Sequence, residues 1–418
     1  MNMTWFFDRL GRGVRLAALA GAVGLAACGG GGGGGGDGVG SGGTGSFAVG
    51  PISGFGSVIV NGIRYDDSGA DVFDDDGNAV TANDLRLGMV IEVTGSELAS
   101  TATGPTANAS SIRFSSEIVG PVEAVDVTAG TLKVLGQDVD VTATTVYDED
   151  LSGRLAAVEV GQIVEVYGLG SGSGRYTATR IELKNPGRDN YRLRGPVREL
   201  DTQAQTFRIG ETLVSYADLP DSETPALANG QLVRVRLEPV PVNGAYVTQR
   251  LRGGERQVED RDEAEIEGLV SSVEAGNPRR FSVDGIPVEA SDAEFDDGTP
   301  ADLAVGVRVE VEGRLEAGVL IAREVEFEGD DGGSDGGSGN GGDDDDDGSE
   351  IKLSGRIQSL DTVNQTFELR GVTVRYSGAV RFDDGTVANL GNDVVVEVKG
   401  GLASDGVTVQ ASEIDFED

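Results

Sequence analysis

The sequence predicts an all-β protein of five small antiparallel β-barrels in tandem, and three observations favour this fold class. A stretch that alternates apolar and charged residues recurs along the chain, most cleanly at residues 303–313. A hairpin signal comes before each copy, and glycine is abundant (66 residues) while aromatic residues make up only 5%. Alternation with a period of two residues indicates half-buried strands, and glycine suits the tight turns that join them.

The alternating stretch is predicted to be one strand entered through a tight turn. Its five copies occupy residues 85–95, 158–168, 227–237, 303–313 and 390–400. In the last copy Asp393 stands where the others have glycine, and aspartate tolerates the left-handed backbone region better than most residues. Several short strands must hide their edges, and closure into a small barrel does so. The only helix expected is a turn or two near residues 82–87 and at the equivalent positions.

A hairpin with a two-residue turn is predicted early in each module. Asn61-Gly62 and Asp284-Gly285 each separate two apolar runs, which is the strongest short hairpin signal because both turn residues must accept a positive φ. Glycine recurs at the matching position as Gly136, Gly210 and Gly371. A turn with positive φ requires glycine there.

The first residues are predicted to be a signal peptide that directs the protein to the cell envelope. Three arginines precede a short apolar run that ends in Leu25-Ala26-Ala27-Cys28, which resembles the lipobox of bacterial lipoproteins. Cys28, the only cysteine, would then carry the lipid, and Gly29 after it favours the outer membrane by the same resemblance. The alternative is ordinary cleavage after the small residues, with Cys28 an incidental thiol.

The expected organisation therefore has eight segments. They are a lipoprotein signal peptide (1–27), a glycine-rich tether (28–46), module 1 (47–115), module 2 (116–185), module 3 (190–252), module 4 (264–328), a disordered linker of mainly Asp, Gly and Ser (329–349) and module 5 (350–418).

Composition excludes several functions. A formal net charge of −38 repels polyanions and favours a soluble monomer, so nucleic acid is not an expected partner. Histidine is absent, which removes the commonest general base and transition-metal ligand. Paired carboxylates of a glycan-active enzyme remain an alternative, but among 71 acids any such pair is uninformative. Phe55, Tyr167, Tyr176 and Tyr191 are the aromatic residues that could face outward and serve as a sugar platform.

Acidic turns are the metal candidates on the predicted barrels. A Phe-Asp-Asp-Gly pattern could place carboxylates around Ca²⁺, the only cofactor considered; its residues are Asp74, Asp75, Asp76, Asp296, Asp297, Asp383 and Asp384. In the alternative interpretation these aspartates only cap turns, and the aromatic residue enters the core. Residues 343–348 start like a calcium-binding EF-hand loop, but the pattern fails downstream, so a solvated linker is favoured.

Module 3 reverses the charge of the alternating strand. Four modules carry a glutamate at one outward position (Glu92, Glu165, Glu310 and Glu397), whereas module 3 has Arg234, with Arg236 two residues later. One hypothesis is that these arginines dock against a glutamate-bearing face of a neighbouring module. The alternative is an ordinary solvated face, since exposed ion pairs contribute at most about 1 kcal/mol.

The repeat resembles the bacterial family called domain of unknown function 5666. The resemblance lies in the opening Gly-x-Val/Ile pairs (Gly120-Pro121-Val122 and Gly355-Arg356-Ile357), the Phe-Asp-Asp-Gly turns and the Leu-x-x-Gly-x-x-Val-Glu-Val-x-Gly stretch. It implies OB-like (oligonucleotide/oligosaccharide-binding type) barrels in tandem and no established activity. Module 3 departs from the pattern because it lacks the acidic turn and the final glycine.

The functional expectation is a non-enzymatic outer-membrane lipoprotein of a Gram-negative bacterium, facing the periplasm or the surface. Its modules would serve as a spacer or as a binding platform for an envelope protein or glycan. A calcium-responsive surface or adhesion module is the first alternative, and the glycan-active enzyme is the second.

Overall fold

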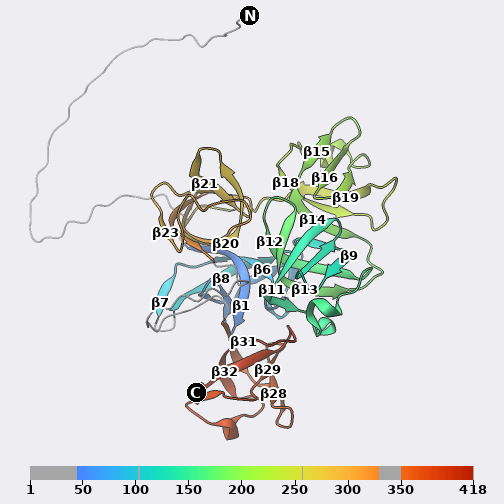
Figure 1. The fold of residues 1–418 in the computed structure, drawn as a ribbon. Helices are drawn as coiled ribbons and strands as arrows, with labels where there is room; N and C mark the ends of the chain where they lie inside the picture. The colour runs from blue at the N-terminus through green and yellow to red at the C-terminus, as the bar shows by residue number, and fades with distance from the viewer. Residues whose placement is uncertain (1–44, 102–103, 257, 329–349, 418) are drawn as a thin grey trace, which may run out of the picture. The chain divides into compact units, whose positions relative to one another are not determined.

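The computed structural model describes the chain except for residues 1–44, 102–103, 257, 329–349 and 418 (Figure 1). The described residues form β-strands and five short 3-10 helices, and they contain no α-helix, which confirms the all-β fold class. None of their helices is long and apolar enough to cross a membrane. The leader, Cys28 and the acidic linker lie outside the described residues.

Module 1 closes a ring of five strands. Strand β1 pairs with β6 and β2, β3 pairs with β2, and β8 pairs with both β3 and β6. All of these pairings are antiparallel except that of β3 with β8, and this order is that of an OB-like barrel. Its elements are β1 (Ser46–Phe55), β2 (Val58–Val60), β3 (Ile63–Asp66), β4 (Asp71–Phe73), β5 (Ala79–Val80), η1 (Ala82–Asp84), β6 (Val90–Gly95), β7 (Ala99–Thr101) and β8 (Gly104–Phe114).

Module 2 repeats the ring with the same single parallel pairing, here between β11 and β13. Its elements are β9 (Ile118–Asp126), β10 (Thr131–Val134), β11 (Gln137–Tyr147), η2 (Glu149–Leu151), η3 (Arg154–Ala157), β12 (Ile163–Gly170) and β13 (Arg175–Lys184). Module 4 closes likewise, with β22 parallel to β25. Its elements are β20 (Arg261–Glu274), β21 (Asn277–Val283), β22 (Ile286–Glu289), β23 (Glu294–Asp296), β24 (Arg308–Glu316) and β25 (Val319–Phe327).

Modules 3 and 5 use two successive strands where the others have one long first strand. Module 3 contains β14 (Tyr191–Pro196), β15 (Arg198–Asp201), β16 (Thr206–Ile209), β17 (Thr212–Ser215), η4 (Asp221–Glu223), β18 (Leu232–Leu237) and β19 (Tyr246–Gly253). Module 5 contains β26 (Ile351–Arg356), β27 (Gln358–Asp361), β28 (Thr366–Leu369), β29 (Val372–Arg375), β30 (Arg381–Asp383), η5 (Val387–Asn389), β31 (Val395–Leu402) and β32 (Val409–Phe416). We keep the five predicted modules as names for these ranges; their number and boundaries stay a prediction.

The predicted turns have the backbone that the sequence requires. Asn61 and Gly62 have φ values of 49° and 71°, and Asp284 and Gly285 have 48° and 83°. Both residues of each pair thus lie in the left-handed region, as a type I′ hairpin turn demands. Asp393 takes this region too, with a φ of 69°.

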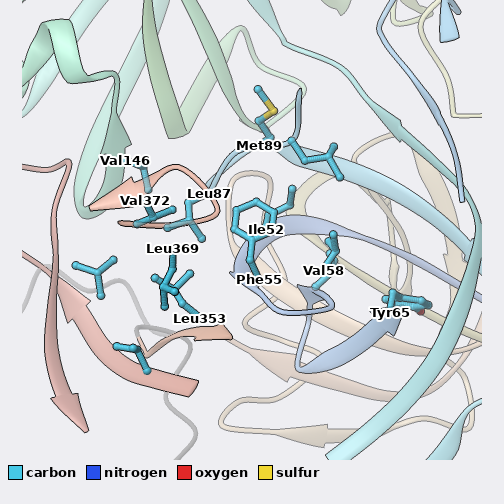
Figure 2. Close-up of a cluster of buried hydrophobic side chains, with 14 of the residues drawn as sticks. Ile52, Phe55, Val58, Tyr65, Leu87, Met89, Val146, Leu353, Leu369 and Val372 are labelled. Carbon is cyan, nitrogen blue, oxygen red and sulfur yellow. The ribbon is translucent and has the colours of Figure 1, made fainter. Parts of the chain in front are cut away.

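Strands and cores continue across the predicted boundaries. Strand β1 pairs in parallel with β20 and, through Gly54 and Phe55, with β26, while β9 pairs with β14. Side chains of module 5 lie in one buried cluster with those of module 1, as Figure 2 shows for Leu353 and Leu369 near Phe55 and Leu87. The modules therefore share apolar surface, which a barrel of this size needs because alone it buries only about 60% of its unfolded surface.

Candidate functional site

Module 3 presents arginines from three adjacent strands on one side of its sheet. Leu193, Val235 and Leu251 point into the barrel core, so the residues between them point out of it. The outward residues oppose one another across the strands, and we call them the arginine face: Arg192, Arg194, Arg234, Arg236, Arg250 and Arg252. Like charges placed opposite each other destabilise a sheet, so this face requires acidic partners.

The acidic turn of module 1 supplies several of these partners. Arg234 donates to the Asp75 carboxylate and Arg236 donates to Asp76. Arg192 lies 3.1 Å from Asp76, and Arg252 donates to the Asp75 carbonyl oxygen at 2.5 Å. The structure thus places Arg234 and Arg236 at a contact between modules, but against turn aspartates. The hypothesis named a glutamate-bearing face as the partner, and in the structure these two arginines pair with Asp75 and Asp76.

Arg194 lies at the centre of a buried charge network, with its side chain only 2% exposed. Its Nη1 is 3.1 Å from Glu117 of module 2 and 2.6 Å from Asp284 of module 4. Its Nε donates to the Gly254 carbonyl at 2.7 Å. One guanidinium therefore joins three modules.

Arg256 extends the network to module 1. Its Nε is 2.6 Å from Asp284 and its Nη1 is 2.5 Å from Glu92. Burial alone would raise the pKa of Asp284, but Arg194 and Arg256 outweigh it, and the pKa lies below its usual range. Burial also raises the pKa of Glu117, and the attraction of Arg194 does not reverse this shift. Asp284 is hydrogen-bonded by two guanidinium groups, whereas Glu117 is bonded by Arg194 alone and is also repelled by the charge of Asp284.

Two cavities adjoin the network, and Arg194, Glu255 and Gly285 line both. The first, of about 740 Å³, has a polar wall that includes Asn229 and three serines, Ser271, Ser272 and Ser282. The second, of about 1120 Å³, is lined by arginines from modules 1, 3 and 4 and the segments between them. Ligand sites are concave and often lie at interfaces between domains, so these cavities are the candidate functional site.

Aromatic side chains do not form the exposed platform considered from the sequence. Phe55, Tyr167 and Tyr176 are all buried, and Tyr191 is half-buried against Tyr246, with the ring centroids 6.2 Å apart. The Tyr176 hydroxyl instead donates to the Arg194 carbonyl oxygen at 2.5 Å. Tyr176 and Tyr191 pack in the core of modules 2 and 3, whereas Tyr167 leaves its own barrel and packs with Phe55 in the cluster of modules 1 and 5.

Several aspartates of the acidic turns stabilise the backbone of the turn itself. The Asp74 carboxylate accepts from the Asp76 and Asn78 backbone N–H groups, at 2.9 and 2.8 Å. Asp297 and Asp384 are each the second aspartate of their own turn, and their φ values are 55° and 52°. Asp296 raises the pKa of the neighbouring Glu324, and Asp383 pairs with Arg381. Calcium binding at these turns stays a prediction.

A different acidic group brings three carboxylates together in the described part of the chain. Glu265, Glu310 and Glu312, on β20 and β24, place oxygens within 4.8 Å of one another. Burial raises the pKa of Glu265, and the neighbouring charge of Glu310 raises it further. Burial also raises the pKa of Glu310. We call these three residues the glutamate cluster.

The sequence did not point to the central residues of the network. Glu117 stands at a module boundary, Asp284 was read as a turn residue, and Arg256 lies in a charged segment between modules. The sequence does carry a signal for Arg192 and Arg194, since they alternate with Leu193 as Arg234 and Arg236 alternate with Val235.

The comparisons with known proteins identify the repeat. The model of the family "domain of unknown function (DUF5666)" matches residues 119–182, 267–326 and 354–415, within modules 2, 4 and 5. No curated protein matches the chain. A solved structure described as "drosophila Unr CSD456" is similar at 15% identity and a TM-score of 0.16, over 44% of this chain and 88% of that one. Three regions of the chain thus match the DUF5666 family model, which is consistent with a tandem-repeat protein of this kind.

Proposed function

We propose that this protein is a non-enzymatic cell-envelope lipoprotein whose β modules form a binding platform for a protein or glycan. The observation that carries the proposal is the junction where Arg194, Glu117 and Asp284 meet beside two cavities. A spacer needs only contacts between neighbours in sequence. Beside this junction module 3 also contacts module 1 through Arg234 and Asp75, and module 1 pairs with module 4 through β1 and β20, so modules that are not neighbours in the chain meet around the cavities. Such an arrangement is better suited to holding a partner.

The buried charges favour a fixed platform over a flexible string. Breaking a buried ion pair leaves an uncompensated charge, which costs several kcal/mol. Arg194 and Asp284 are separated by 90 residues, yet both are almost fully buried. Modules joined in this way would present their cavities in a constant geometry.

A cavity-directed crosslink tests the platform. A photoreactive residue replacing Ser272 lines the first cavity, and one replacing Val363, which is 88% exposed, is the matched surface control. We expect a discrete adduct in native envelopes from position 272 and no such adduct from 363. Equal labelling from both positions contradicts a cavity-based platform.

The proposed localisation rests on the sequence around Cys28. We propose a mature chain tied by Cys28 to the outer membrane of a Gram-negative bacterium, with the modules facing the periplasm or the surface. Radiolabelled palmitate should enter the wild-type chain and not Cys28→Ser, and fractionation should recover only the lipidated form in outer membranes. Label in Cys28→Ser, or wild-type protein without label, contradicts this localisation.

A calcium-responsive module is the second candidate, and one observation favours it. In module 4, burial together with Asp297 and Asp296 raises the pKa of Glu326, so these acids crowd one edge of the barrel. Calcium bound only by the native state must raise the melting midpoint. We would expect millimolar calcium to do so in the wild type and not in Asp296→Asn/Asp297→Asn. An equal midpoint with and without calcium rejects this candidate.

A further inference from the structure

The larger junction cavity has a wall rich in arginine, although the protein has only 33 lysines and arginines against 71 acids. We call this cavity of about 1120 Å³ the arginine cavity. Its lining includes Arg113, Arg194, Arg234, Arg252, Arg256 and Arg261. Guanidinium groups gathered around open space are suited to hold oxyanions, because each presents a planar fork of N–H donors.

Three of these arginines are fixed by the protein itself. Arg194 and Arg256 share the Asp284 carboxylate. Arg234 binds Asp75, the Ser116 carbonyl at 2.9 Å and the Ser115 hydroxyl at 3.1 Å. These bonds hold one side of the wall rigid, so little conformational entropy would be lost when a ligand binds against it.

Arg113 and Arg252 have unused donors. Arg113 faces Glu92 across β6 and β8, but the Glu92 carboxylate is taken by Arg256. The Arg113 guanidinium instead lies 5.3 Å from the centre of the Phe73 ring, and among the described residues it forms no ion pair. Arg252 bonds Asp75 through a single nitrogen, Nη2, and its side chain is 36% exposed.

The acids of the wall are mostly neutralised already. Asp75 pairs with Arg234, Glu92 with Arg256, and Glu259 with Arg261. Because these carboxylates are paired, they repel an entering anion less. The anion can then bind the unused N–H groups of Arg113 and Arg252. The hydroxyls of Thr94, Ser111 and Ser115 also line the cavity and can donate to further oxygens.

We propose that the arginine cavity binds a small oxyanion, with Arg113 and Arg252 as its direct ligands. The shared chemistry is a carboxylate, sulfate or phosphate group, carried by a free anion or by an acidic sugar. The net charge of −38 disfavours long polyanions and leaves a ligand of limited charge. This inference rests on the proposed function, since it names the class of ligand that the platform would hold.

Calorimetric titration of the full chain tests the inference with three probes at constant ionic strength: sulfate, phosphate and glucuronate. We expect saturable binding of at least one probe, weakened at least tenfold in Arg113→Gln/Arg252→Gln. The matched control is Arg280→Gln/Arg314→Gln, which removes two arginines with 56% and 53% exposed side chains on module 4. The control should bind like the wild type.

The three probes distinguish between the possible ligands. Preference for glucuronate assigns an acidic sugar, and preference for sulfate or phosphate assigns a free anion. No saturable binding, or equal weakening in both double variants, overturns the inference. If the Gln variant does not fold, Arg113→Lys/Arg252→Lys is tested in its place. It keeps both charges but removes the planar guanidinium groups, so it should bind the anion less tightly than the wild type. The crosslink from position 272 does not depend on these arginines, so its success together with failed anion binding would refute only the ligand class.

Discussion

Two buried groups of charged residues in this protein solve the same problem differently. Around Arg194, each carboxylate has at least one guanidinium within hydrogen-bonding distance. In the glutamate cluster, Glu265 is buried and Glu310 is half-buried, and each has the other as a close partner. Burial disfavours a lone charge, so Asp284, with two guanidinium groups bonded to it, has a lowered pKa and remains ionised, whereas Glu117 and the glutamate cluster have raised pKa values. The comparison teaches that partner identity, and not burial alone, fixes the protonation state.

Arg194→Met should have the largest effect, because it leaves Glu117 and Asp284 buried without this partner. We expect a loss of about 3–5 kcal/mol in the free energy of unfolding, measured by urea denaturation. Arg208→Met is the control: its pair with Glu199 is exposed on both sides, so the loss should be under about 1 kcal/mol. Equal losses in the two variants would show that the buried pairs of Arg194 stabilise the protein no more than an exposed pair does.

Arg234→Glu/Arg236→Glu should have the next largest effect. The variant sets glutamates against Asp75 and Asp76 and replaces attraction by repulsion between modules 3 and 1. We expect a loss of about 2–4 kcal/mol and a larger hydrodynamic radius by light scattering. An unchanged radius would show that these pairs do not hold the modules together.

Opposite responses to pH distinguish Asp284 from the glutamate cluster. Raised pKa values in the glutamate cluster mean that the folded state holds more protons than the unfolded state above about pH 4.5, so its stability falls as the pH rises from there. The lowered pKa of Asp284 works in reverse, and its contribution is lost as the pH falls below about 3.8.

Glu310→Gln sharpens this contrast. The amide needs no proton, so the variant should be more stable than the wild type at pH 8 by about 1 kcal/mol or more, since each unit of raised pKa corresponds to about 1.4 kcal/mol. Melting midpoints between pH 5 and 8 should therefore fall less steeply in the variant. Parallel pH profiles would mean that the cluster stays ionised.

Asp384→Asn should have the smallest effect. Asparagine also accepts a positive φ, so a residue needed only for the turn tolerates this change within about 0.5 kcal/mol. Asp384→Ala should lose about 1–2 kcal/mol in a thermal melt, because it strains the left-handed backbone. If Asn is as harmful as Ala, the carboxylate charge itself matters at this turn.

Much of the fold could be predicted because its signals are local. The turn residues Asn61 and Gly62, and Asp393 in place of glycine, follow from what each backbone position permits. The rest depends on contacts between distant segments. Nothing near Glu117 or Arg256 in sequence indicates that Asp284 and Arg194 lie beside them, and burial of Tyr176 depends on its register in β13. Local patterns specify strands and turns; the charge network depends on how barrels meet.

Strand β1 carries a consequence for any shortened version of this protein. Its first residues border β20 and its last border β26, while it also closes its own ring. Bare strand edges recruit other chains, so a protein that began after Phe55 would uncover β20 and β26 together with the opened barrel. Such a fragment should self-associate, since one missing segment leaves three separate places to which a second molecule can add.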